Sequence, residues 1–220
     1  MLYTPQMGEL LPYWREFAWG ALFTIALTLT TTFVGVAIGV AGASLRAFGP
    51  RWADVCVGAY VELIRNTPFI VQLFFVFFGL PALGVKLSET QAAFVAMSAN
   101  LGAYCVEIVR AGLQASPRGQ IEAGLSLALT RMQVLRHVLL APALRRVWPA
   151  LSSQIVIVML GSSVVSQISA EDLTYAANLV QSRNFRAFES YFAATLVYLA
   201  LALILREALR RLGARLFAGP

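Results

Sequence analysis

The chain has 220 residues, of which 59% are hydrophobic and 13% are charged, and its mean hydropathy is +0.71. A soluble domain has about 25% charged residues, so this composition excludes both a water-soluble globular protein and a disordered chain. The net charge is +6, carried on its basic side by 16 arginines and a single lysine, Lys86. A phosphate-binding P-loop needs Gly-Lys-Ser/Thr, whereas Lys86 lies between Val85 and Leu87, so the chain has no Walker A motif.

Five uncharged stretches predict membrane-spanning helices, because each approaches or exceeds the ~20 residues that cross a ~30 Å hydrocarbon core. Helices fit such stretches because they satisfy their own backbone polar groups in lipid. The third and fifth stretches are short, so we extend them past Glu107 and before Glu189. The expected spans are about 17–45, 66–85, 90–110, 147–170 and 188–208. The predicted fold is an all-α polytopic membrane protein with five spans in one domain, residues 1–220.

The basic residues predict the orientation of these spans. Thirteen Lys and Arg fall on the side that holds 46–65, 107–146 and 206–220, and four fall on the other side. The positive-inside rule makes the first side cytoplasmic. We therefore expect the N-terminus outside and the C-terminus inside.

Small residues recur every four positions in the first span, at Gly35, Gly39 and Ala43. Such a face allows close contact between helices, either within the bundle or with a second subunit. The alternative is a random pattern in a span that is rich in Gly and Ala.

The longest hydrophilic stretch, 107–146, carries its own helix signals. Ser116 before Pro117 is typical of a helix start, and Thr130 with Gln133 forms a capping-box pattern. These signals predict two short cytoplasmic helices at roughly 117–129 and 131–140. The small residues on the first helix permit a close fit, either to a partner's groove or to the protein's own spans.

Polar groups inside the expected spans are candidates for a transport pathway, because buried polar groups in a membrane tend to face a cavity or the protein interior. Interhelical hydrogen bonding is the alternative role. The candidates are Gln72, Asn100, Ser162, Ser163, Ser166 and Gln167.

Two pairs of opposite charges have the i,i+3 spacing that places both side chains on one helix face. They are Glu62 with Arg65 and Glu107 with Arg110. We interpret both as structural ion pairs near the membrane interface.

The stretch from Gln120 to Ala128 resembles the EAA motif of ABC-importer permeases. Glu122 and Ala123 match the motif, whereas Gly124 replaces its second Ala and Ala128 replaces its Gly. Three further stretches, 60–75, 100–112 and 185–189, are similar to permeases of the polar amino-acid group, so the likeness covers roughly 17–212. In that family the fourth span usually carries Lys-Asp, where this chain has Leu160-Gly161.

This resemblance implies the permease subunit of a bacterial inner-membrane importer for amino acids of the histidine, glutamine, glutamate and arginine group. It implies four kinds of partner: an ATPase dimer, a second permease that is identical or paralogous, a periplasmic amino-acid-binding protein, and the lipid bilayer. ATP and Mg would be bound by the ATPase, with no cofactor or metal in this chain; nucleic acid is not an expected partner. The implied coupling loop is 111–146. Its expected ATPase contacts are Glu122, Ala123, Gly124, Ala128, Arg131 and Arg136.

Other functions compete with this interpretation. A secondary transporter or channel subunit is the main alternative, although the chain has no evident repeat. A membrane enzyme needs a nucleophile–base set or metal ligands, which one His, two isolated Cys and few carboxylates do not supply. A scaffold would leave the capped cytoplasmic helices unexplained.

Overall fold

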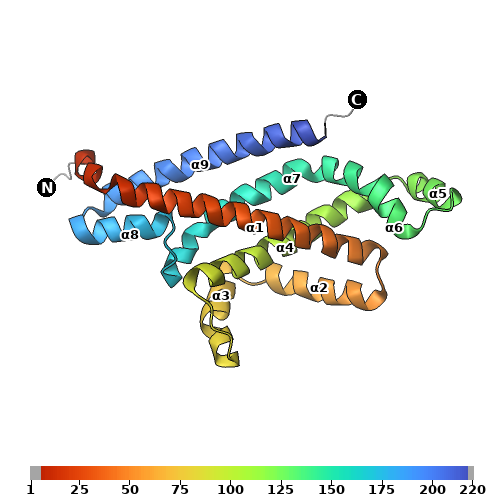
Figure 1. The fold of residues 1–220 in the computed structure, drawn as a ribbon, viewed down its shortest axis with the longest axis horizontal. Coiled ribbons are helices and arrows are strands. Elements are labelled where there is room, and N and C mark those ends of the chain that lie inside the picture. The colour runs from red at the N-terminus through yellow and green to blue at the C-terminus, as the bar shows by residue number, and fades with distance from the viewer. Residues whose placement is uncertain (1–5, 218–220) are drawn as a thin grey trace. The chain divides into compact units, whose positions relative to one another are not determined.

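A computed structural model describes residues 6–217, and every regular element in that range is a helix (Figure 1). The all-α prediction is therefore confirmed. The longer helices are α1 (Trp14–Phe48), α2 (Arg51–Arg65), α4 (Glu89–Gln114), α7 (Leu140–Gly161), α8 (Leu173–Asn184) and α9 (Ala187–Leu216). The shorter elements are η1 (Met7–Tyr13), α3 (Phe69–Phe74), η2 (Phe75–Gly79), η3 (Leu80–Leu83), α5 (Arg118–Ser126), α6 (Arg131–Val134), η4 (Leu135–Leu139) and η5 (Ser162–Ile168).

Within residues 6–217, four helical stretches are long and apolar enough to cross a membrane, and a fifth is added if α2 and 69–83 count as one broken span. The four are Met7–Phe48, Glu89–Gln114, Arg131–Ile168 and Ala187–Leu216. The break follows from Pro68, because a proline disfavours helical geometry in the residue before it. The second expected span, 66–85, is thus helical only over 69–83, and residues 66–68 separate it from α2.

The chain forms two compact units. Of the described residues, unit 1 contains 6–31, 70–97 and 156–207, and unit 2 contains 32–69, 98–155 and 208–217. In unit 1, α8 is the centre of the apolar core. The core members are Phe17, Leu173, Ala177, Val180 and Ala194.

Unit 2 depends on close packing between α1 and α4. A Cβ built on Gly39 would lie 2.2 Å from Cys105 Cβ, and one on Gly35 would lie within 3 Å of Leu101. Ala43, one turn further on, is fully buried. The predicted small-residue face is therefore a contact within the chain's own bundle, because only residues without bulk allow α1 to approach α4 so closely.

The C-terminal part of α9 is fastened to α7 within unit 2. Trp148 Nε1 donates a hydrogen bond to the Leu209 carbonyl at 3.0 Å, and the indole packs against Phe217. Gly213 lies under the same ring, where a Cβ would come within 2.1 Å of Nε1.

A buried carboxylate, Asp172, begins α8 in unit 1. Its Oδ1 accepts the backbone N–H of Tyr175 at 2.8 Å, as an N-cap residue does, and its Oδ2 accepts the Tyr198 hydroxyl at 2.8 Å. The expected spans leave 171–187 as a connecting loop, so α8 was not predicted. Burial disfavours the charged form and raises the pKa of Asp172 from 3.8 to about 6, although these hydrogen bonds oppose the shift.

We expect the raised pKa of Asp172 to make stability depend on pH. The folded chain binds this proton more tightly than the unfolded chain, so the stabilisation is complete below about pH 4 and is lost as pH rises through about 6. Over that range the free energy of unfolding should fall by on the order of 2–3 kcal/mol. Thermal unfolding in detergent from pH 4 to 7 measures the slope. In Asp172→Asn the side-chain oxygen can still cap α8, but the group no longer titrates, so the pH dependence that Asp172 causes should vanish. An unchanged slope would contradict the raised pKa of Asp172.

Candidate functional site

The segment between α4 and α7 contains the predicted coupling residues and begins with α5. Pro117, with φ −60° and ψ 132°, occupies the N-cap position, so α5 starts at Arg118. The expected N-cap, Ser116, is buried, and its hydroxyl donates to the Gly112 carbonyl of α4. The helix start is therefore one residue later than predicted, because the serine side chain is used by the preceding helix.

The end of α5 is a Schellman turn centred on Ala128. Ala128 has φ +59°, its N–H donates to Leu125, and the Leu129 N–H donates to the Gly124 carbonyl. This left-handed conformation favours glycine, because a Cβ crowds the following carbonyl. The permease motif that the segment resembles has glycine at this position, and the geometry explains why.

We expect Ala128→Gly to stabilise the protein by about 1 kcal/mol, because glycine adopts positive φ without the Cβ penalty. Ala123→Gly is the matched comparison, since Ala123 lies inside the same helix, where glycine costs about 1 kcal/mol. Thermal unfolding midpoints of the two variants should therefore move in opposite directions. Equal shifts would show that the turn carries no strain.

The predicted capping box is present at the next helix. Thr130 Oγ1 accepts the Gln133 N–H at 3.3 Å, and Gln133 Oε1 accepts the Thr130 N–H at 2.8 Å. The helix does not stop near residue 140 as expected. It continues through the π-helical turn η4 into α7, so residues 131–161 form one unbroken helical stretch. A displacement of α6 would therefore be carried along α7.

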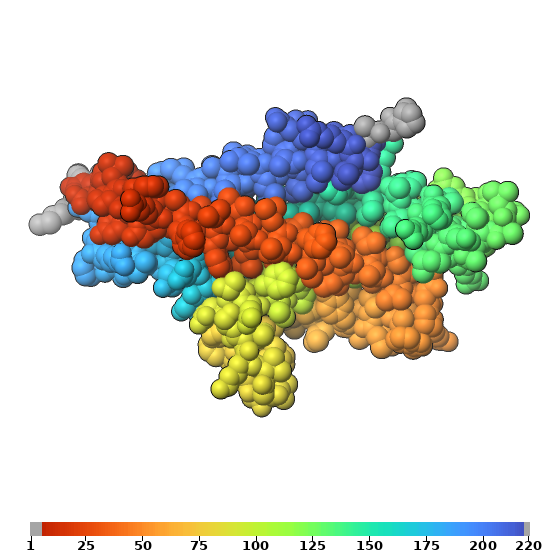
Figure 2. All heavy atoms as spheres, viewed as in Figure 1, coloured from red at the N-terminus to blue at the C-terminus, as the bar shows by residue number. Residues whose placement is uncertain are grey.

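The α5–α6 segment lies on the surface (green in Figure 2). Its exposed side chains include both charged and apolar groups. Glu122, Ala123, Ala128, Arg131 and Arg136 are all exposed. Gly124 is buried, because α5 rests there against Val134 of α6.

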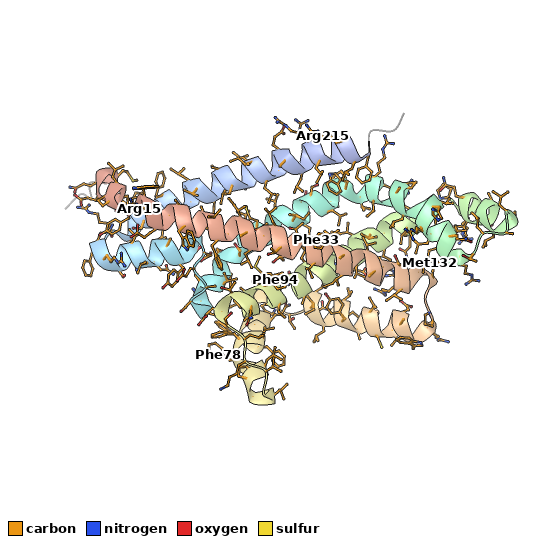
Figure 3. The ribbon with its side chains drawn as sticks, in the orientation of Figure 1. Arg15, Phe33, Phe78, Phe94, Met132 and Arg215 are labelled. Atoms are coloured by element: carbon orange, nitrogen blue, oxygen red, sulfur yellow. The ribbon has the colours of Figure 1, made fainter. Side chains whose placement is uncertain are left out.

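Three exposed apolar side chains lie on the same segment, and the sequence analysis singled out neither Leu127 nor Met132. Leu127 is 76% exposed, and Met132, labelled in Figure 3, is 63% exposed. Leu125 is 44% exposed. The sequence itself could have indicated these residues, because apolar side chains on a short polar helix that also carries small residues are typical of a docking face.

A second candidate site in unit 2 is a charged pocket of about 360 Å³ between α1, α2 and α4. Arg46 Nη1 donates to Glu107 at 2.6 Å and Arg46 Nε donates to Asp54 at 2.9 Å. Arg110 lies 3.5 Å and Arg65 lies 3.7 Å from the same Glu107 carboxylate.

The four residues predicted as ion pairs all line this pocket, but in a different arrangement. Glu107 and Arg110 are paired as expected. Arg65 pairs with Glu107 and not with Glu62, which has no ion pair among residues 6–217. The physical reason is that α4 packs beside α2, so a carboxylate on the neighbouring helix lies closer than the one on the same helix. Arg46 was missed because no sequence spacing connects residues 46 and 107.

The pathway candidates occupy varied surroundings. Ser162 and Ser166 are buried and donate to backbone carbonyls of their own helix, at 2.7 and 2.9 Å. Gln167 is exposed, and Ser163 and Gln72 are half-buried in unit 1. Asn100 is half-buried in unit 2. Their pathway role stays a prediction.

The family model of binding-protein-dependent transport system inner membrane components matches residues 34–217. The chain belongs to this family. It is 35% identical over 199 residues to the glutamine transport system permease protein GlnP of Escherichia coli K12, covering 90% of this chain and 91% of that protein. It is 32% identical to the L-cystine transport system permease protein TcyB of Bacillus subtilis, covering 88% and 83%.

Solved structures give the same family fold. A chain of an amino acid ABC transporter crystallised with histidines superposes with a TM-score of 0.87 and 31% identity, over 97% of this chain and 100% of that one. A chain of the MetNI methionine ABC transporter in an inward-facing conformation superposes with a TM-score of 0.80 at 22% identity, covering 94% and 98%. The family to which the chain belongs is one of transport permeases.

Proposed function

We propose that this chain is the membrane-spanning subunit of an ATP-driven importer that moves an amino acid from a binding protein to the cytoplasm. The amino-acid assignment is supported by the relatives that are more than 30% identical, whose names refer to glutamine, cystine or amino acids. The importer needs two permease chains, identical or paralogous, a pair of ATPase subunits and the soluble binding protein. It works in the bacterial inner membrane, with the N-terminus outside and the C-terminus in the cytoplasm.

The exposed α5–α6 segment is the observation that carries this proposal. Transport driven by ATP requires that movement of the ATPase reach helices that bind no nucleotide. Rigid elements transmit such movement as bodies, and α6 is continuous with the long helix α7. The exposed Leu127 and Met132 offer apolar contact area to a groove on the ATPase.

Charge supplements that contact. The exposed Glu122 carboxylate can pair with a basic group on the ATPase, and Arg131 and Arg136 with acidic groups. Gly124 serves differently, because its lack of a side chain lets α5 sit close on Val134 and so keeps the segment rigid.

ATP hydrolysis by the reconstituted complex tests the proposal and identifies the substrate. The permease and its ATPase are placed in nanodiscs with the binding protein, and each of the twenty L-amino acids is added, glutamine first. We expect one or a few related amino acids to stimulate hydrolysis. A basal rate that no amino acid changes would contradict the amino-acid assignment. Amino-acid uptake without any ATPase would favour the alternative, a secondary transporter.

A further inference from the structure

Some charged groups of the pocket in unit 2 are already paired with one another, and others keep hydrogen-bonding capacity for a ligand. The Arg46 side chain is fully paired, because it is 14% exposed and its guanidinium binds both Asp54 and Glu107. These two short contacts hold the Glu107 carboxylate in place. Glu107 is therefore part of the pocket wall and has little capacity left for a ligand.

Arg65 and Arg110 keep unused hydrogen-bond donors. Each approaches Glu107 through one nitrogen only, at 3.7 and 3.5 Å, which is longer than a charge-assisted hydrogen bond of about 2.7–2.9 Å. The guanidinium carbon of Arg65 lies 5.4 Å from the centre of the Tyr104 ring, and this cation–π contact orients the Arg65 side chain. Their side chains are 42% and 33% exposed, so a ligand can reach them.

Glu62 adds an unused acceptor to the same pocket. It lines the cavity, it is exposed, and its carboxylate has no partner among residues 6–217. The pocket thus presents two open cationic groups and one open anionic group.

We propose that this pocket binds an α-amino acid as its zwitterion, with the carboxylate on Arg65 and Arg110 and the ammonium group on Glu62. The inference rests on the proposed function and gives the permease its own recognition site for the two groups that all α-amino acids share. The cavity of about 360 Å³ is at the small end of ligand pockets, which span about 300–1,000 Å³. An anionic headgroup fits less well, because Glu62 and Glu107 would both repel a phosphate.

Binding without the binding protein tests this site. The permease–ATPase complex in nanodiscs is titrated with the tritiated amino acid that stimulates hydrolysis, and its methyl ester and N-acetyl derivative compete with it. The ester lacks the carboxylate charge and the N-acetyl form lacks the ammonium charge. For the wild-type complex we expect each derivative to compete about tenfold or more weakly than the parent amino acid.

Two variants separate the two ends of the ligand. Glu62→Gln should bring the N-acetyl derivative to the affinity of the parent while the ester stays weak, and Arg110→Gln should do the reverse. Arg51→Gln is the matched control, because Arg51 is exposed on α2 and does not line the pocket. Since the Glu62 carboxylate has no hydrogen bond or ion pair among residues 6–217, its variant should fold. Co-purification of the ATPase checks both variants.

The results distinguish this inference from the proposed function. If the ester and the N-acetyl derivative compete as weakly in both variants as in the wild type, the pocket assignment is overturned, even while amino-acid uptake continues. Binding that responds to phosphatidylglycerol in the nanodisc and not to N-acetylation would make the pocket a lipid site and would also overturn it. If no amino acid stimulates hydrolysis or enters vesicles, the proposed function itself fails.

Discussion

Glu122→Arg should reduce recovery of the ATPase with the affinity-tagged permease at least about tenfold and abolish ATP-driven uptake. Glu122 is exposed on α5, so the change removes a negative charge from the proposed contact and places a positive charge there. Like-charge contacts across an interface cost several kcal/mol. Because the side chain is not buried, membrane insertion and the unfolding midpoint should stay as in the wild type.

Glu9→Arg is the control for this prediction. Glu9 is an exposed carboxylate in η1, near the N-terminus, which we expect on the opposite side of the membrane from the ATPase. Its substitution therefore makes the same change of charge away from the proposed contact. It should leave ATPase recovery unchanged. Full recovery of the ATPase by Glu122→Arg would contradict the coupling role of α5, and equal losses in both variants would point to a nonspecific charge effect.

Gly39→Ala should lower the free energy of unfolding by about 2–3 kcal/mol, the upper part of the range for overpacked cores. The added Cβ would lie 2.2 Å from Cys105 Cβ and about 3 Å from two Cys105 backbone atoms. Since backbone atoms cannot turn aside as a flexible side chain does, α1 and α4 would have to separate. The unfolding midpoint in detergent, together with the yield of monodisperse protein, measures the effect.

Gly161→Ala tests whether this loss depends on position. Gly161 ends α7, and apart from its own helix backbone and chain neighbours no heavy atom of the described residues lies within 4 Å of a Cβ built there. Alanine is the better helix former, so this variant should be as stable as the wild type or slightly more stable. If both variants lose stability equally, the α1–α4 contact is not as close as described.

Local signals in the sequence predicted local structure well. The capping box at Thr130 and Gln133 formed as expected, since it needs only residues three apart. The small-residue face of the first span also proved to be a close helix contact. Both features depend on helical periodicity, which a single sequence contains in full.

Features that depend on the neighbouring helix were not predictable. Arg65 was expected to meet Glu62 and instead meets Glu107, because the packing of α2 on α4 decides which carboxylate is nearer. The helix α8 was overlooked because a count of uncharged residues detects spans and not a twelve-residue helix. Its start signal, Asp172 at the N-cap, was present in the sequence. The break before Phe69 likewise had a signal in Pro68.

Uptake by proteoliposomes tests the central claim most directly. The wild-type permease is reconstituted with its ATPase, the binding protein and a labelled amino acid, and accumulation is followed with ATP and with a non-hydrolysable analogue. We predict accumulation against a gradient that requires ATP hydrolysis and the binding protein, and that is lost in Glu122→Arg but kept in Glu9→Arg. Accumulation that persists without ATP, or without the ATPase, would contradict the account.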